Sequence, residues 1–204
     1  MPILKAVFAG VLLLVPAGVW AQQGKYGQAA QPEMDLAVTY TAQRASTVAK
    51  NTFWPQGGSA ELTATFFHGL GMAADVTGTQ INQMQGPGAS NSTGLTLVTA
   101  TFGPKYTWAL PGKARSARQW RIFGESLIGI ANGLDSTFPG ANGATTDANS
   151  LALQVGGGVD LNLTHHFALQ LLHADWLRTQ LPNGTTNVQN TMELGAGIVL
   201  RFKH

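Results

Sequence analysis

Five histidines are the side chains best suited to chemistry in this 204-residue sequence. His165 and His166 are adjacent in a polar segment, and they lack the HExxH spacing of a helical zinc site. His173 and Asp175 are two residues apart, so in a strand they would share a face and could form a His–carboxylate pair. We interpret this pair as packing inside the fold, with catalysis as the alternative. The sequence predicts no catalytic residue, no cofactor and no metal site.

Isolated charged residues of both signs form a second group of side chains that could take part in chemistry. Only 11% of the residues are charged, against about a quarter in most proteins. Eight of them lie among Thr, Gln, Asn and Gly on the polar sides of strand-like segments: Glu61, Asp75, Lys105, Arg121, Glu125, Asp160, Glu193 and Arg201. Opposite charges can pair in a narrow polar interior. We therefore predict that these residues form a structural network, with the lining of a narrow pore as the alternative.

Strands must position these side chains, and the segment from Leu151 to Leu163 shows their pattern best. Its odd-numbered residues are Leu or Val apart from Gly157, and its even-numbered residues are polar or small. A period of two indicates a strand with one apolar face. Similar segments recur along the chain. The eight predicted strands cover residues 35–43, 61–66, 70–77, 98–108, 120–130, 151–163, 167–176 and 192–202.

The seventh of these segments breaks the alternation. Leu169 and Leu171 follow it, but the same parity would place His173 and Asp175 on the apolar face. A β-bulge inserts one extra residue into a strand and so reverses the faces beyond it. We therefore predict a bulge near Leu171 and Leu172.

The apolar faces of the predicted strands must meet either lipid or the protein's own core. The polar faces hold fewer Lys and Glu residues than a water-exposed surface normally does. Seven aromatic residues lie mostly near strand ends, as in the girdle of a membrane barrel: Tyr40, Phe66, Tyr106, Trp108, Trp120, Trp176 and Phe202. We therefore predict an all-β fold, an eight-stranded antiparallel up-and-down transmembrane β-barrel. A soluble sandwich is the alternative.

The N-terminal residues have the pattern of a secretory leader. Lys5 precedes an apolar run over residues 6–15, Pro16 ends that run, and Ala21 completes a small-residue cleavage site. We expect a signal peptide over residues 1–21 and a barrel domain over residues 22–204. The sequence has no Cys, which excludes disulfides and thiol chemistry. Its 12 basic and 10 acidic residues are nearly balanced, so we expect no nucleic-acid partner.

Four segments carry a resemblance to a known family. They are residues 102–106 (Phe-Gly-Pro-Lys-Tyr), 156–160 (Gly-Gly-Gly-Val-Asp), 174–179 (Ala-Asp-Trp-Leu-Arg-Thr), and 187–190 leading into 195–202. In these the chain resembles the small bacterial outer-membrane β-barrel proteins, both the OmpA-transmembrane-domain-like eight-stranded barrels and the barrel domain of acidobacterial-type outer-membrane proteins. The resemblance implies contact with outer-membrane lipids and lipopolysaccharide. It also implies that Phe202 serves as the assembly signal read by the barrel-assembly machinery.

Function is expected to follow from this plan. We predict a non-enzymatic protein with a structural or surface-display role, whose partner would be an extracellular ligand of the loops. Four loops would face outward: Ala45–Gly58, Gln80–Gly94, Gly133–Ser150 and Leu181–Gln189. The first alternative is a narrow porin-like channel for small solutes. The second is a lipid-modifying enzyme that uses a Ser and a His. Ser126 lies on the apolar face of its predicted strand, but no histidine is predicted close to it.

Overall fold

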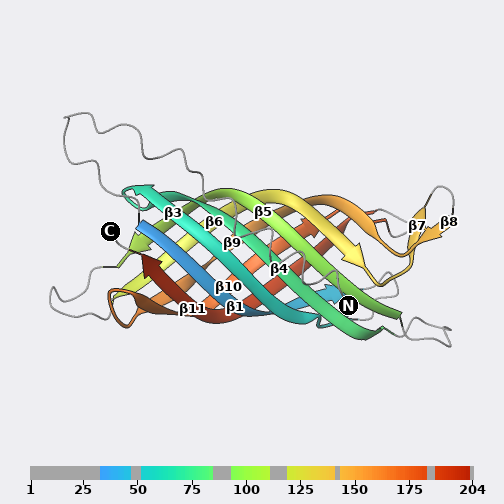
Figure 1. Ribbon diagram of the computed structural model, residues 1–204, viewed down its shortest axis with the longest axis horizontal. Helices are drawn as coiled ribbons and strands as arrows, with labels where there is room; N and C mark the ends of the chain where they lie inside the picture. The colour runs from blue at the N-terminus through green and yellow to red at the C-terminus, as the bar shows by residue number, and fades with distance from the viewer. Residues whose placement is uncertain are drawn as a thin grey trace.

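Alternation of apolar and polar residues produces eight long strands that form a closed barrel (Figure 1). The structure is a computed structural model, and it describes residues 33–46, 52–84, 93–110, 119–140, 143–182 and 187–202. The long strands are β1 (Glu33–Ser46), β3 (Gln56–Phe67), β4 (Leu70–Met84), β5 (Thr93–Ala109), β6 (Trp120–Leu134), β9 (Ala148–Asn162), β10 (Phe167–Thr179) and β11 (Gln189–Phe202). The predicted signal peptide lies outside the described residues.

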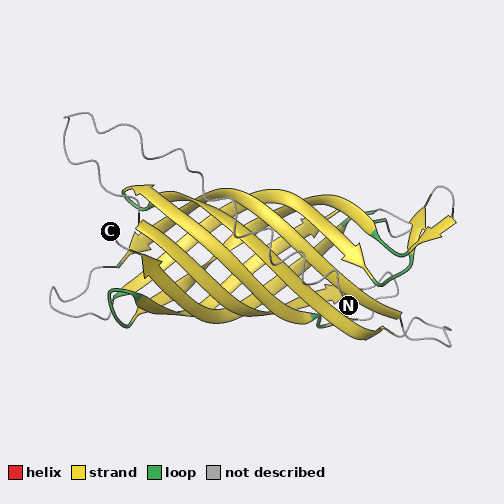
Figure 2. Cartoon of the chain, in the orientation of Figure 1, coloured by secondary structure: helices red, strands yellow, loops and turns green. Residues whose placement is uncertain are grey.

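Each long strand pairs antiparallel with the next one in the sequence, and β11 pairs with β1 to close the barrel. Figure 2 shows strands along the whole barrel wall. Closure gives every long strand a neighbour on both sides. The backbone N–H and C=O groups can then form hydrogen bonds between strands, which is necessary because lipid offers them no partners. The predicted fold class is therefore confirmed.

No helix among the described residues is long and apolar enough to cross a membrane.

The two ends of the barrel differ in their connections. One end carries the tight turn at His68 and Gly69, where both residues have positive φ, and the short connection between β9 and β10. The first residue of β1 and the last of β11 lie there too. We call this the turn end, and we call the opposite end the loop end.

Several strands are longer than predicted, so the loops between them are shorter than predicted. β3 begins at Gln56 and β4 continues to Met84, so both strands include residues of the predicted loops. The predicted loop from Gly133 to Ser150 contains a small hairpin of β7 (Phe138–Gly140) and β8 (Gly143–Thr145). A two-residue strand, β2 (Thr52–Phe53), pairs with the end of β1. A strand needs only about ten residues to cross a bilayer, so these extensions need no apolar face and gave no apolar signal.

The predicted bulge in β10 is confirmed. Its pairing with β9 runs from Gln170 directly to Leu172, which leaves Leu171 as the extra residue. Both Leu171 and Leu172 are exposed on the outside, and His173 and Asp175 are buried inside. The bulge therefore reverses the parity of β10 and turns these two polar side chains into the barrel.

The interior has a polar middle between two small apolar layers. Near the turn end, Ala37, Ala168 and Val199 pack together. Near the loop end, Ala131, Ala152 and Leu177 form the second layer, with Leu97 against it. The outer surface is apolar instead, and large side chains such as Ile128 and Ile130 are more than half exposed. Barrel closure has thus put the polar faces inside and the apolar faces outside.

Candidate functional site in the barrel interior

The charged side chains of the long strands face the barrel interior because they share parity with the buried Thr and Gln residues. Among the described residues of these strands, every Asp, Glu and Lys lies on the inward face. The charged side chains on the outward face are Arg44 and Arg178, both near the loop end. Charge has therefore been almost entirely removed from the surface that would meet lipid.

The centre of the interior holds a chain of alternating acids and bases. Lys105 Nζ lies 2.5 Å from Glu61 Oε1 and 3.0 Å from Glu125 Oε2. His173 Nε2 lies 3.1 Å from Glu125 Oε1 and 2.9 Å from Asp175 Oδ2. These residues come from β3, β5, β6 and β10, so the chain crosses the interior from wall to wall. All five side chains are buried.

Neutral side chains add further hydrogen bonds to this central chain. The Gln154 amide donates to Asp175 Oδ2 at 2.6 Å and its carbonyl accepts from Thr101 at 3.0 Å. The Thr63 hydroxyl donates to Glu61 at 2.9 Å. Lys105 also lies 3.6 Å from the ring centroid of Phe123, close enough for a cation–π contact. The central charges are thus held from several sides.

Two further carboxylates flank the central chain. Asp75 on β4 is directly opposite Glu61 and accepts a hydrogen bond from Thr77 at 2.7 Å. Glu193 on β11 is directly opposite Asp175, and accepts from the Gln43 amide at 2.8 Å. Neither carboxylate has an ion pair among the described residues.

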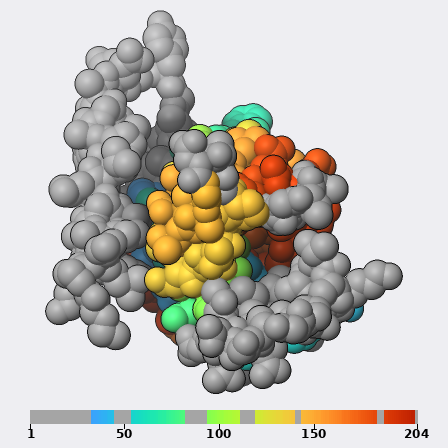
Figure 3. Space-filling view, turned by 90° about the vertical axis from the view of Figure 1, so that its right-hand side faces the viewer, coloured from blue at the N-terminus to red at the C-terminus, as the bar shows by residue number. Residues whose placement is uncertain are grey.

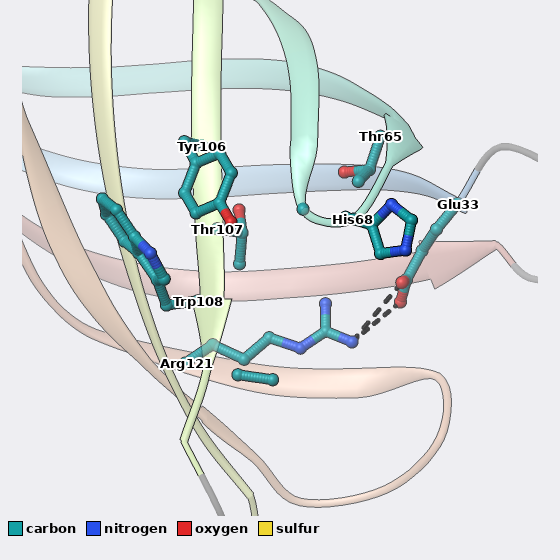
Figure 4. A pocket seen from close by; sticks show the side chains of 9 residues that line it. Glu33, Thr65, His68, Tyr106, Thr107, Trp108 and Arg121 are labelled. Carbon is teal, nitrogen blue, oxygen red and sulfur yellow. Dashed lines mark hydrogen bonds and ion pairs between the residues drawn. The ribbon is translucent and has the colours of Figure 1, made fainter.

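A second charged group lies at the turn end. Arg121 Nη2 is 3.1 Å from Glu33 Oε1, and Arg201 Nε is 3.3 Å from Asp35 Oδ2. Arg201 also approaches Asp160 at 3.8 Å. A pocket of about 360 Å³ opens here, and Figure 4 shows Arg121 turned toward Glu33 along its wall. This group closes the turn end of the interior with paired charges.

All eight residues of the predicted network lie inside the barrel, in these two places. Glu61, Lys105 and Glu125 meet at the centre, whereas Arg121, Asp160 and Arg201 are near or in the group at the turn end. The prediction did not include Glu33 or Asp35 in the network. Asp35 has the right parity, but the sequence does not show that β11 closes against β1 and places Arg201 directly opposite Asp35.

Two glycines of β9 make room for the network. A Cβ on Gly156 would lie 1.8 Å from Asp175 Oδ1, and one on Gly158 would lie 2.6 Å from the Phe123 ring. Only glycine fits at these two positions, because Asp175 and Phe123 occupy the space that a side chain would need. The sequence also left Phe123 and Leu127 of β6 unassigned, and both are buried inside. Their apolar type gave no sign of an inward position.

The site has donor atoms that could hold a metal. Single ligand atoms of Glu61, Glu125 and His173 lie within 4.8 Å of one another. Lys105 contacts both glutamates, so its ammonium group already supplies a cation at that point. Ser126 is exposed on the outside of β6 and His173 is buried inside, so these two cannot act together.

No protein-family model matches the sequence, and no curated protein matches it. Among solved structures, the chain is similar to the attachment invasion locus protein Ail of Yersinia pestis, in complex with the heparin analogue sucrose octasulfate. The similarity covers 84% of this chain and 99% of Ail, with a TM-score of 0.54 and 15% sequence identity. Neisserial surface protein A is similar over 83% of this chain and 97% of its own, with a TM-score of 0.55 and 16% identity. The chain has the fold of the small eight-stranded outer-membrane β-barrels. At these identities the likeness concerns the fold.

The apolar outer surface agrees with that fold. Large apolar side chains are exposed on every long strand, among them Val38, Leu62, Phe102, Val155 and Ile198. A surface of this kind is stable only in lipid. The barrel is therefore an integral membrane protein, and its fold and surface fit the bacterial outer membrane.

Proposed function

We propose that the chain is a non-enzymatic outer-membrane protein that holds its loop end rigidly at the cell surface. The observation that carries this proposal is the ion-paired chain that crosses the interior from Glu61 to Asp175. An eight-stranded barrel is only just wide enough for side chains to fill. Here the central side chains are buried and paired with one another, which supports a filled wall-to-wall core over an open channel.

The loop end has a feature suited to display. The β7–β8 hairpin occupies the centre of Figure 3, which looks at this end of the molecule. Phe138 of β7 and Leu181 are buried, and Phe138 packs so closely on Gly133 that a Cβ there would lie 2.6 Å from its ring. The hairpin is thus anchored on the rim of the barrel, while β8 is exposed along its whole length. A fixed, exposed hairpin is a surface that a partner can bind with little loss of conformational entropy.

The charge of this hairpin segment limits the type of extracellular ligand. Residues 135–147 include Asp135 and Asp147 and contain no Lys or Arg. A sulfated sugar such as the one bound to Ail would be repelled by these two carboxylates. We therefore propose a neutral or cationic ligand for this segment.

The two outward arginines support contact with phosphate-bearing lipids such as lipopolysaccharide. Arg44 on β1 pairs with Met192 on β11, and Met192 pairs with Trp176 on β10. Arg178 is two residues after Trp176, on the same outward face of β10. Long basic side chains near the end of a membrane span reach the headgroup region, where phosphates attract them. Their place near the loop end agrees with this end facing the outer leaflet.

We propose that assembly uses the end of β11. Phe202 is half exposed on the outer surface and pairs with Met34 at the turn end. An exposed aromatic residue on the last strand is accessible to the barrel-assembly machinery, in keeping with the role that the family resemblance implies. Export through a cleaved leader over residues 1–21 stays a prediction.

Display and conduction can be separated in one set of measurements. An epitope inserted between Gly140 and Gly143 should be labelled on intact cells, whereas one inserted between His68 and Gly69 should be labelled only after permeabilisation. The purified protein should give no steady conductance in a planar bilayer. An unlabelled hairpin on intact cells would contradict display. Steady conductance would favour the channel, and a mass shift of lipid A on expression would favour the enzyme.

A further inference from the structure

The central interior contains more negative charge than its own bases can neutralise. Five buried carboxylates gather there: Glu61, Asp75, Glu125, Asp175 and Glu193. The bases among them are Lys105 and His173. Even with His173 protonated, five acids against two bases leave an excess of three negative charges. Isolated buried charge is expensive unless it is paired, so a further cation or proton is required.

Two pairs of these carboxylates are directly opposite each other, Asp175 with Glu193 on β10 and β11 and Glu61 with Asp75 on β3 and β4. Directly opposed like charges destabilise a pair of strands. Asp75 is 1% exposed and Glu61 is 3% exposed, so water screens neither of them.

Each of the two carboxylates has one oxygen without a partner. Glu61 Oε1 contacts Lys105 and accepts from Thr63, but Glu61 Oε2 has no hydrogen-bond partner among the described residues. Asp75 Oδ1 accepts from Thr77, and Asp75 Oδ2 likewise has none. Buried acceptors of this kind are seldom left unsatisfied in a folded protein. Both unpartnered oxygens belong to residues that are directly opposite each other on neighbouring strands.

We propose that Glu61 and Asp75 bind a hard divalent cation, Mg²⁺ or Ca²⁺, inside the barrel. Carboxylate oxygens are the ligands these ions prefer, and Mg²⁺ is commonly held by only one or two carboxylates with water completing its shell. The ion would occupy a place distinct from the one that Lys105 takes between Glu61 and Glu125. It would reduce the excess charge of the centre from three to one. The site is independent of the display role and would exist in a channel as well.

The test measures metal retained by the folded barrel. Wild-type protein, Asp75→Asn and Asp147→Asn are refolded in detergent with Mg²⁺ or with Ca²⁺, desalted, and analysed for metal content. Asp147 is exposed in the loop between β8 and β9, so its variant removes the same charge from outside the barrel. Heat-modifiable gel migration establishes that each sample is folded. Wild type and Asp147→Asn should retain about one ion per chain, and Asp75→Asn should retain at least tenfold less.

A second measurement keeps the proposal testable if Asp75→Asn does not fold. Refolding wild type with EDTA should lower its unfolding temperature, and adding Mg²⁺ or Ca²⁺ during refolding should restore it. Glu61→Gln provides a second variant, which should also lose the ion. Wild-type protein without bound metal, or with an unfolding temperature insensitive to EDTA, would overturn the proposal. Equal metal content in wild type and a folded Asp75→Asn would overturn it as well, because the ion would then lie elsewhere.

Discussion

At the residue scale, Lys105 is the centre of the interior. Its ammonium group joins two glutamates on different strands and lies over an aromatic ring. A buried ion pair of this kind adds little net stability compared with apolar packing, because desolvation offsets the attraction. Removing Lys105 alone is destabilising, because the charges of Glu61 and Glu125 then stay buried without a partner.

We therefore expect Lys105→Met to lower the free energy of unfolding by about 3 kcal/mol. The methionine fills similar space, so the loss reports the unpaired Glu61 and Glu125. Urea titration of the protein in lipid vesicles, followed by gel mobility, measures the change. Arg178→Met is the matched control, because Arg178 is exposed on the outside, and it should change stability by less than about 0.5 kcal/mol. Similar losses in both variants would mean that the central pairs are not responsible.

At the scale of the element, the bulge in β10 decides which side chains enter the interior. It absorbs one extra residue, Leu171, so that His173, Asp175 and Leu177 still face the interior. Without that residue the pairing would run regularly from Gln170 to Leu172, with Leu172 opposite Val159. The register with both neighbouring strands shifts by one residue at the bulge, so a strand without Leu171 would keep the partners that it has on either side.

This geometry predicts that deletion of Leu171 is tolerated. The shortened strand would keep Gln170 and His173 inside, and pair with β9 and β11 in the same register. Deletion of Val159 removes an outward apolar residue from the regular strand β9, and must turn one half of that strand inside out. Folding into vesicles, measured by heat-modifiable migration, should survive the first deletion and fail with the second. Failure of both would show that the bulge is itself required.

At the scale of the whole molecule, the barrel separates an apolar exterior from a charged interior. The sequence alone predicts that a charge at Val155 blocks assembly and that Gln154 accepts one. The structure makes the second half of this prediction more specific. Gln154 donates to Asp175, so a carboxylate there would be repelled, whereas a cation could pair with Asp175.

We expect Val155→Arg to fold poorly into vesicles and Gln154→Lys to fold well. Val155 is 42% exposed on the outer surface, where an arginine in the bilayer costs about 2–4 kcal/mol depending on its depth. Folding yield at a fixed lipid ratio measures both variants, and Gln154→Glu tests the sign of the interior charge. Equal yields for Val155→Arg and wild type would contradict a lipid-facing position.

Much of the barrel could be predicted from the sequence because strand parity is a local property. The alternation over residues 151–163 established which side chains share a face, and the broken alternation of β10 located the bulge. The inward position of the eight charged residues in the predicted network could be predicted in the same way, from their place on polar faces. Strand ends were less predictable, because beyond the hydrocarbon region neither face has to be apolar.

The sequence by itself thus determined the strands, their faces and the class of surface that meets lipid. Only the tertiary structure decided which charges pair. Lys105 meets Glu61 and Glu125 because closure brings β3, β5 and β6 around one narrow interior, and β3 is separated from β5 by an intervening strand. It also decided that Asp75 and Glu61 are opposed with one oxygen each unpaired. Pairing of charges depends on register and curvature, which arise only when all eight strands have closed into the barrel.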